Sequence, residues 1–189
     1  MESIKEIFKI GYGPSSSHTM GPRKAAEIFK EKNPNAHSYR VTLFGSLAST
    51  GKGHGTDFAI IKELAPLKVE IIWKQEIELA KHPNALKLES LDANLGILNE
   101  WTVYSVGGGK ITDFTSDETE KIVYPHTFLT DILKWTKQTG KSFWEYVVEK
   151  EGEEIFDYLL EVWQTMEEAI ARGIDSEGII PGGLKLSRK

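Results

Sequence analysis

Alternation of apolar and polar residues, together with β-branched side chains, predicts five strands in the first 114 residues. The clearest candidate is the run SYRVTLF at residues 38–44. The others lie at residues 68–73, 86–90, 101–106 and 110–114, and a triple glycine at 107–109 joins the last two as a hairpin. A helical period of apolar residues predicts helices over residues 4–10, 23–32 and 58–64.

Two segments rich in glycine, proline and serine interrupt this pattern and are predicted as loops. The first covers residues 11–22 and leads into the helix at 23–32. The second covers residues 45–57 and follows the first strand, with Thr56 or Asp57 as the expected N-cap of the next helix. Polar side chains in such loops are accessible to a ligand.

After residue 126 the pattern changes to long helical periods without alternation. Three helices are predicted there, and their residues Trp135, Trp144 and Trp163 are expected to lie in a core. The predicted fold class is α/β (α+β): a small domain at residues 1–122, with a mixed or antiparallel sheet and helices on one face, followed by a helical extension at 123–189.

The composition excludes several classes of function. The 189 residues carry 23 Lys and Arg against 28 Asp and Glu, a net charge of −5, which does not favour a nucleic acid as partner. There is no cysteine, so disulfides, thiol nucleophiles and clusters held by this chain alone are excluded. No run approaches the ~20 apolar residues of a membrane span, and residues 1–13 do not form a signal peptide. A cytoplasmic protein is expected.

The second glycine-rich loop does not match the common phosphate-binding patterns. Five residues, instead of four, separate Gly45 from Gly51, and Gly53 follows Lys52 where a P-loop has Ser or Thr. Thr56 replaces the third glycine of a dinucleotide fingerprint. A weaker role of Lys52 and the loop amides in holding a carboxylate stays open.

The five histidines, at positions 18, 37, 54, 82 and 126, do not have the spacing of a metal site, and no metal is predicted. Ser17 beside His18 is not a hydrolase dyad, because side chains of adjacent residues diverge. His18 and His54 each lie in a polar loop, where a titrating imidazole can reach a substrate. His82 is predicted to make a structural hydrogen bond or a ligand contact.

Three motifs together carry a resemblance. Residues 13–19 (GPSSSHT), 44–48 (FGSLA) and 50–57 (TGKGHGTD) resemble the N-terminal, or beta, part of the bacterial iron-sulfur L-serine dehydratases. The resemblance runs to about Phe114. It implies deamination of L-serine to pyruvate and ammonia, with a 4Fe-4S cluster acting as Lewis acid on the hydroxyl group. The cysteines of that cluster belong to the alpha part of the family, and this chain has none.

The same resemblance implies roles for residues of the three motifs. His18 and His54 are candidates for proton transfer or substrate orientation, and which of them is the base stays open. The hydroxyl groups are candidate donors to the substrate carboxylate; they belong to Ser15, Ser16, Ser17 and Thr19. Lys52, Thr56 and Asp57 are carried over as substrate-binding candidates from the third motif.

Two functions follow as alternatives. In the first, the chain is a component of an L-serine dehydratase, inactive alone, whose loops complete an active site with an alpha subunit or a missing catalytic domain. Residues 166–184 resemble the opening of that alpha part, and apolar positions of the tail would mark the contact. In the second, the chain is a regulatory module that binds L-serine, because the beta part is similar to the allosteric substrate-binding domain of some phosphoglycerate dehydrogenases. Either implies a homo- or hetero-oligomer, and L-threonine stays open as substrate.

Overall fold

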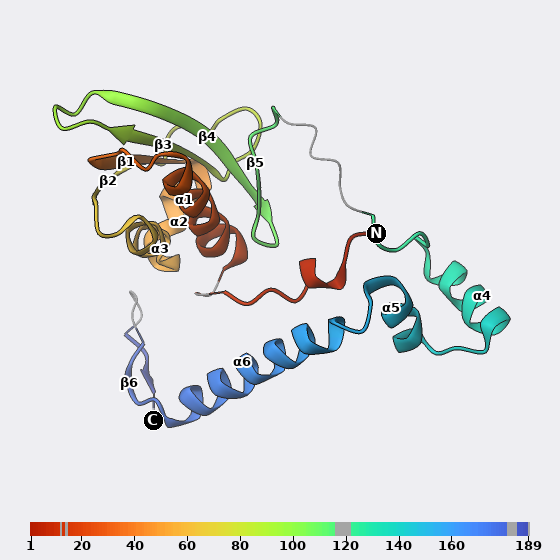
Figure 1. Ribbon diagram of the computed structural model, residues 1–189. Helices are drawn as coiled ribbons and strands as arrows, with labels where there is room; N and C mark the ends of the chain where they lie inside the picture. The colour runs from red at the N-terminus through yellow and green to blue at the C-terminus, as the bar shows by residue number, and fades with distance from the viewer. Residues whose placement is uncertain (12, 14, 116–121, 181–184, 189) are drawn as a thin grey trace. The chain divides into compact units, whose positions relative to one another are not determined.

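The computed structural model describes the chain except residues 12, 14, 116–121, 181–184 and 189. Two parts of the segments that carry the resemblance therefore lie outside the described residues. They are Pro14 of the first motif and residues 181–184 of the segment at 166–184. The chain forms two compact units. Gly11–Asp117 form the sheet unit, and Met1–Ile10 with Glu118–Lys189 form the helical unit (Figure 1).

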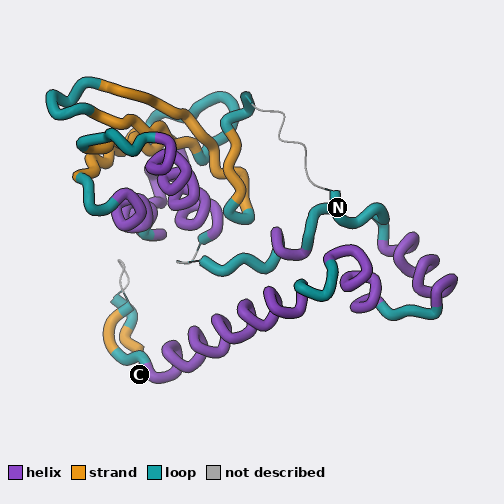
Figure 2. Tube along the Cα trace, viewed as in Figure 1, coloured by secondary structure: helices purple, strands orange, loops and turns teal. Residues whose placement is uncertain are grey.

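The sheet unit contains a mixed five-stranded sheet, as predicted. Its strands, drawn in orange in Figure 2, lie in the order β2-β1-β3-β4-β5. Strands β1 and β2 are parallel, and the other pairs are antiparallel. The strands are β1 (Ser38–Phe44), β2 (Lys68–Lys74), β3 (Ala85–Leu91), β4 (Ile97–Gly107) and β5 (Lys110–Thr112). All five predicted strands are thus present, and the triple glycine forms the hairpin turn with three positive φ angles.

Three helices cover one face of this sheet (Figure 1). They are α1 (Gly21–Lys32), α2 (Gly45–His54) and α3 (Thr56–Leu64). Every second residue of β1, namely Tyr39, Val41 and Leu43, is buried beneath them. The opposite face is polar: Arg40 of β1 forms ion pairs with Glu70 of β2 and Glu89 of β3. This alternation explains why the strands could be read from the sequence.

The two segments predicted as loops are largely helical. Residues 45–57 form α2, a left-handed residue at Gly55 and the start of α3, so Gly55 is the N-cap and the expected cap at Thr56 or Asp57 is wrong. Ser16–Met20 form a π-helical turn, η2, which leads directly into α1. In contrast, the helix predicted over residues 4–10 is only one 3-10 turn, η1 (Ile4–Glu6).

The helical unit contains α4 (Leu129–Thr139), α5 (Phe143–Glu151) and α6 (Ile155–Asp175), followed by the short strands β6 (Gly178–Ile179) and β7 (Ser187–Arg188). The first residues of the chain belong to this unit. The Met1 amine donates to the carbonyl of Tyr124 at 2.7 Å, and the amide of Ile4 donates to the Glu151 carboxylate at 2.9 Å. Among the described residues, no helix has the length and apolarity needed to cross a membrane.

The expectation that the tryptophans form a core is wrong for two of them. Trp144 and Trp163 are 61% and 53% exposed, whereas Trp135 is half-buried and packs edge-on against Tyr146. The helical period shows which residues share one face of a helix, but it does not show whether another part of the structure covers that face.

A buried asparagine ties α1 to the sheet. The Asn33 amide nitrogen donates to the carbonyl of Phe29 at 2.7 Å. Its oxygen accepts hydrogen bonds from the Ser90 hydroxyl at 3.0 Å and the Asn99 amide at 2.8 Å. Asn33 therefore satisfies polar groups of a helix end and of two strands at once.

We predict that Asn33→Ala lowers the free energy of unfolding by about 2 kcal/mol, because it leaves buried hydrogen-bonding groups without partners. Urea denaturation followed by circular dichroism measures the change. Asn35→Ala, two positions away and exposed, is the control and is expected to change stability by less than about 0.5 kcal/mol. Equal effects of the two substitutions would contradict this role of Asn33.

Candidate functional site

Two histidines from different elements meet beside the N-terminal end of α1. His18 lies in η2 and His54 is the last residue of α2. Their ring centroids are 4.8 Å apart, with an angle of 36° between the ring planes. The structure thus brings together the two imidazoles that the sequence singled out.

Two threonines hold these histidines in place by crossed hydrogen bonds. The Thr19 hydroxyl donates to the backbone carbonyl of His54 at 3.0 Å. The Thr56 hydroxyl donates to the backbone carbonyl of His18 at 2.5 Å. Thr19 directly follows His18 and binds the backbone of His54. Thr56 lies two positions after His54 and binds the backbone of His18. The distance between the rings is therefore set by buried backbone contacts, since Thr19 and Thr56 are both buried.

Both ring nitrogens of His18 have hydroxyl partners. Nδ1 shares a hydrogen bond with the Ser17 hydroxyl at 3.0 Å, so the expectation that these two adjacent side chains diverge is wrong. Nε2 shares a hydrogen bond with the Ser46 hydroxyl at 3.1 Å. The Ser15 hydroxyl accepts from the His18 amide at 3.1 Å and so caps η2. Because a hydroxyl can donate or accept, this arrangement suits either neutral tautomer of His18.

Ser46 is itself fixed by the loop between β2 and β3. The amide of Gly45 donates to the carbonyl of Ile77 at 2.8 Å, and the amide of Ser46 donates to the carbonyl of Pro83 at 3.1 Å. Gly45 has φ +47°, and a Cβ there would lie 2.8 Å from the Pro83 carbonyl oxygen. Only glycine allows α2 to begin so close to this loop.

The hydrogen bond of His54 identifies its neutral tautomer. Nδ1 lies 3.0 Å from the backbone carbonyl of Thr50. A carbonyl only accepts, so Nδ1 carries the proton and Nε2 keeps its lone pair. His54 is half-buried. In this tautomer His54 presents an unprotonated Nε2, whereas both nitrogens of His18 are engaged.

The pKa of His18 lies below its ordinary value of 6.5. Burial is the main cause, since it disfavours the charged imidazolium, and the nearby charge of His54 adds to the effect. The contact with Ser46 opposes both. His18 is consequently held in its neutral form at neutral pH.

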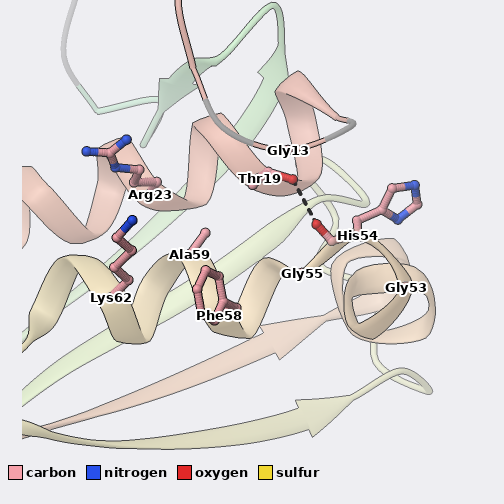
Figure 3. Close-up of a pocket in the computed structure, with 9 residues that line it drawn as sticks. All are labelled: Gly13, Thr19, Arg23, Gly53, His54, Gly55, Phe58, Ala59 and Lys62. Atoms are coloured by element: carbon pink, nitrogen blue, oxygen red, sulfur yellow. Dashed lines mark hydrogen bonds between the residues drawn. The ribbon is translucent and has the colours of Figure 1, made fainter. Parts of the chain in front are cut away.

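A pocket of about 330 Å³ adjoins the histidine pair (Figure 3). It lies between η2, α1 and α3, and Figure 3 shows His54 at one end and the cationic side chains of Arg23 and Lys62 at the other. The glycines of the wall leave the backbone accessible. The lining residues are Gly13, Thr19, Arg23, Gly53, His54, Gly55, Phe58, Ala59 and Lys62.

Two of the candidate residues point elsewhere, and a third is open to solvent. The ammonium group of Lys52 lies 5.3 Å from the centroid of the Trp73 ring, and the Asp57 carboxylate accepts from the amide of Phe58. The Ser16 residue is exposed. Conversely, Ser46 contacts His18, and only its place in the second motif distinguishes it in the sequence.

The donor set of this chain does not fit an iron-sulfur cluster. Such clusters are held by thiolates, and the sequence contains no cysteine. In the part of the chain that the structure describes, no three His, Asp or Glu side chains are grouped as metal ligands.

Comparison with known proteins identifies the family of the chain. The profile of the serine dehydratase beta chain family matches residues 3–70 and 65–116, which include all three motifs. The L-serine dehydratases of Haemophilus influenzae and Streptomyces coelicolor are 34% and 32% identical to the chain. L-serine dehydratase 1 of Escherichia coli is 31% identical. These alignments cover 99–100% of the chain but only 53% of each relative.

The chain belongs to the serine dehydratase beta chain family. It spans about half the length of the curated relatives that it matches.

We predict that His54→Gln raises the pKa of His18 toward 6.5 but not fully to it, because burial remains after the charge is removed. Titration of the imidazole resonances by NMR measures this shift. Lys52→Gln removes a charge from the same helix, but its ammonium group lies over Trp73, so the pKa of His18 is expected to stay unchanged. An unchanged pKa in His54→Gln would contradict the coupling of the two rings.

The same shift predicts how stability depends on pH. Folded His18 binds a proton more weakly than the unfolded chain does, so protonation favours unfolding. This contribution to stability is complete above pH 6.5 and is lost as the pH falls below that value. The urea midpoint measured between pH 7.5 and 5.5 is therefore expected to fall less in His18→Gln than in the parent chain.

Proposed function

We propose that the chain supplies the proton-transfer side of an L-serine dehydratase active site, which an alpha part completes. The observation that carries this proposal is the pair of imidazoles, one neutral and engaged, the other with an open Nε2, beside a pocket of about 330 Å³. The names of the relatives support the substrate. L-Serine is taken here in preference to L-threonine for that reason.

His54 is the proposed base. Elimination from a β-hydroxy amino acid requires removal of the α-proton, and Nε2 of His54 has the lone pair to accept it. The Thr50 carbonyl stabilises the imidazolium that forms, because it accepts from Nδ1–H throughout. In this scheme His54 takes the proton from the α-carbon and later releases it to solvent.

His18 is proposed as a positioning residue. Its ring packs beside His54, and its two nitrogens are occupied by Ser17 and Ser46. A neutral ring at this place keeps a second positive charge away from His54 when that residue is protonated. Thr19 and Thr56, whose hydroxyls bind backbone carbonyls, have the same kind of role.

The carboxylate of the substrate is proposed to bind the first motif. Ser16 is exposed at the first turn of η2, which makes its hydroxyl accessible. Ser15 and Ser17 can also donate if their contacts with His18 are exchanged for the ligand. Lys52 and Asp57, which point elsewhere, are proposed to act only after the alpha part has docked.

The departure of the hydroxyl group is assigned to the alpha part. In the family resemblance a 4Fe-4S cluster acts there as Lewis acid, and the absence of cysteine means that this chain cannot hold it. The residues of this chain account for proton removal and substrate orientation alone.

A regulatory role is the second candidate. The pocket beside His54 is lined by residues of the sheet unit only, so it can bind a small molecule without a second chain. In that case L-serine would bind here as an effector.

Calorimetry distinguishes the two. L-Serine is titrated into the chain alone and into the chain mixed with the half of the H. influenzae enzyme that the chain does not match, with iron and sulfide supplied. We expect heat of binding and pyruvate only in the mixture. Saturable binding to the chain alone, without pyruvate in the mixture, would support the regulatory role instead.

In the same mixture we expect His54→Gln to lower kcat by about 10²- to 10⁴-fold with little change in KM, because a general base acts in the transition state. Exchange of the α-hydrogen of serine with deuterated solvent, followed by NMR, is expected to fall in parallel. His37→Gln, which changes an exposed histidine outside the site, is the matched control. Unchanged exchange in His54→Gln would assign the base to another residue.

A further inference from the structure

The longest helix of the helical unit presents an apolar stripe to solvent. Its members are 51–72% exposed and recur every three or four residues over five turns: Phe156, Leu160, Trp163, Met166, Ile170 and Ile174. At 1.5 Å per residue the stripe is about 27 Å long. Apolar surface of this extent, here interrupted by the exposed Glu167, marks an interaction site in a folded protein.

The neighbouring side of α6 is already used within the unit. Ile155 is fully buried, and the Tyr158 hydroxyl donates to the backbone carbonyls of Lys5 and Phe8. Contacts with residues 1–10 thus explain the burial of one sector of α6. They leave the stripe unexplained, since all of its members except Met166 lie in a different sector of the helix from Ile155 and Tyr158.

The comparisons indicate what covers the stripe. The beta chain profile ends at residue 116, before α4, α5 and α6 begin. The full-length relatives nevertheless align with 99–100% of this chain, so the helical unit is shared with them outside the beta chain region. About half of each relative has no counterpart here. That half is the available source of a matching apolar surface.

The charges on α6 disfavour a second copy as the occupant. The helix carries five carboxylates against one guanidinium, and Asp157, Glu168 and Asp175 follow one edge of the stripe. Two copies of α6 packed along their stripes would bring these acidic edges close together. A partner with Lys or Arg beside an apolar face is complementary.

We propose that the α6 stripe is the docking surface for the remainder of the alpha part, the half of the relatives that this chain does not match, which contributes an apolar helical face flanked by basic residues. This inference rests on the proposed function for the identity of the partner. It locates the contact on α6, which belongs to a different unit from the histidine pair, so the two claims are tested by different measurements.

Hydroxyl-radical footprinting tests the contact directly. The chain is labelled alone and after mixing with the unmatched half of the H. influenzae enzyme, and oxidation is quantified at Trp163, Met166 and Trp144. We expect Trp163 and Met166 to be oxidised in the chain alone and at least fivefold less in the mixture. Trp144 is similarly exposed but lies on α5, and it is expected to change by less than twofold.

Substitutions supply the energetic test by sedimentation velocity. Trp163→Ser is expected to weaken the 1:1 complex at least tenfold, and Trp144→Ser less than twofold. Circular dichroism verifies that both variants keep the parental helix content. No L-serine is added to these samples, so the measured affinity does not depend on catalysis.

Four outcomes would overturn the proposal: no complex, equal weakening by both substitutions, protection of Trp163 in the monomeric chain alone, or self-association that Trp163→Ser abolishes. The last would make a second copy the occupant. Formation of the complex without pyruvate would leave the docking surface standing and refute the proposed function instead.

Discussion

The candidate site depends on two threonine hydroxyls that donate in opposite directions. Thr19 binds the carbonyl of His54, and Thr56 binds the carbonyl of His18. Each bond crosses more than 30 residues of sequence, and both hydroxyls are buried. Loss of either would leave a buried carbonyl without its partner and free the π-helical turn from the corner between α2 and α3. The distance between the two rings follows from these two hydrogen bonds, and the proposed roles of the two histidines depend on that distance.

The sheet could be predicted from the sequence because each strand carries its own signal. In β1, apolar residues alternate with polar ones, and the structure buries the apolar set. Helix α2 had no such signal, since its glycines at 45, 51 and 53 lower the intrinsic helix propensity. It forms because Leu47 and Ala48 are buried in the core and because Gly51 allows a close approach to Thr56 and Trp73. Tertiary packing here overrides local preference.

The site was predictable as a set of motifs but not as an arrangement. His18 and His54 could be selected from their polar, glycine-rich surroundings, yet Ser46 becomes a partner only through a contact across 28 residues. The tautomer of His54 depends on a backbone carbonyl one turn earlier, which periodicity does not reveal. The tryptophans show a second limit of prediction from sequence. Trp163 lies on a regular apolar face, but the sequence pattern does not tell whether that face packs against its own chain or against another chain.

Residues 1–10 belong to the helical unit although the sheet unit lies between them and the rest of that unit in the sequence. The order in which these segments are synthesised therefore differs from the order in which they can fold. The amide of Ile4 leaves the ribosome 147 positions ahead of Glu151, the carboxylate to which it donates. At 5–20 residues per second, translation inserts a delay of about 7 to 30 s between the two. The sheet unit has every one of its strands during that interval, so it can form as a nascent domain while the leading segment waits. Closure of the helical unit therefore waits for residues that are synthesised after the whole sheet unit.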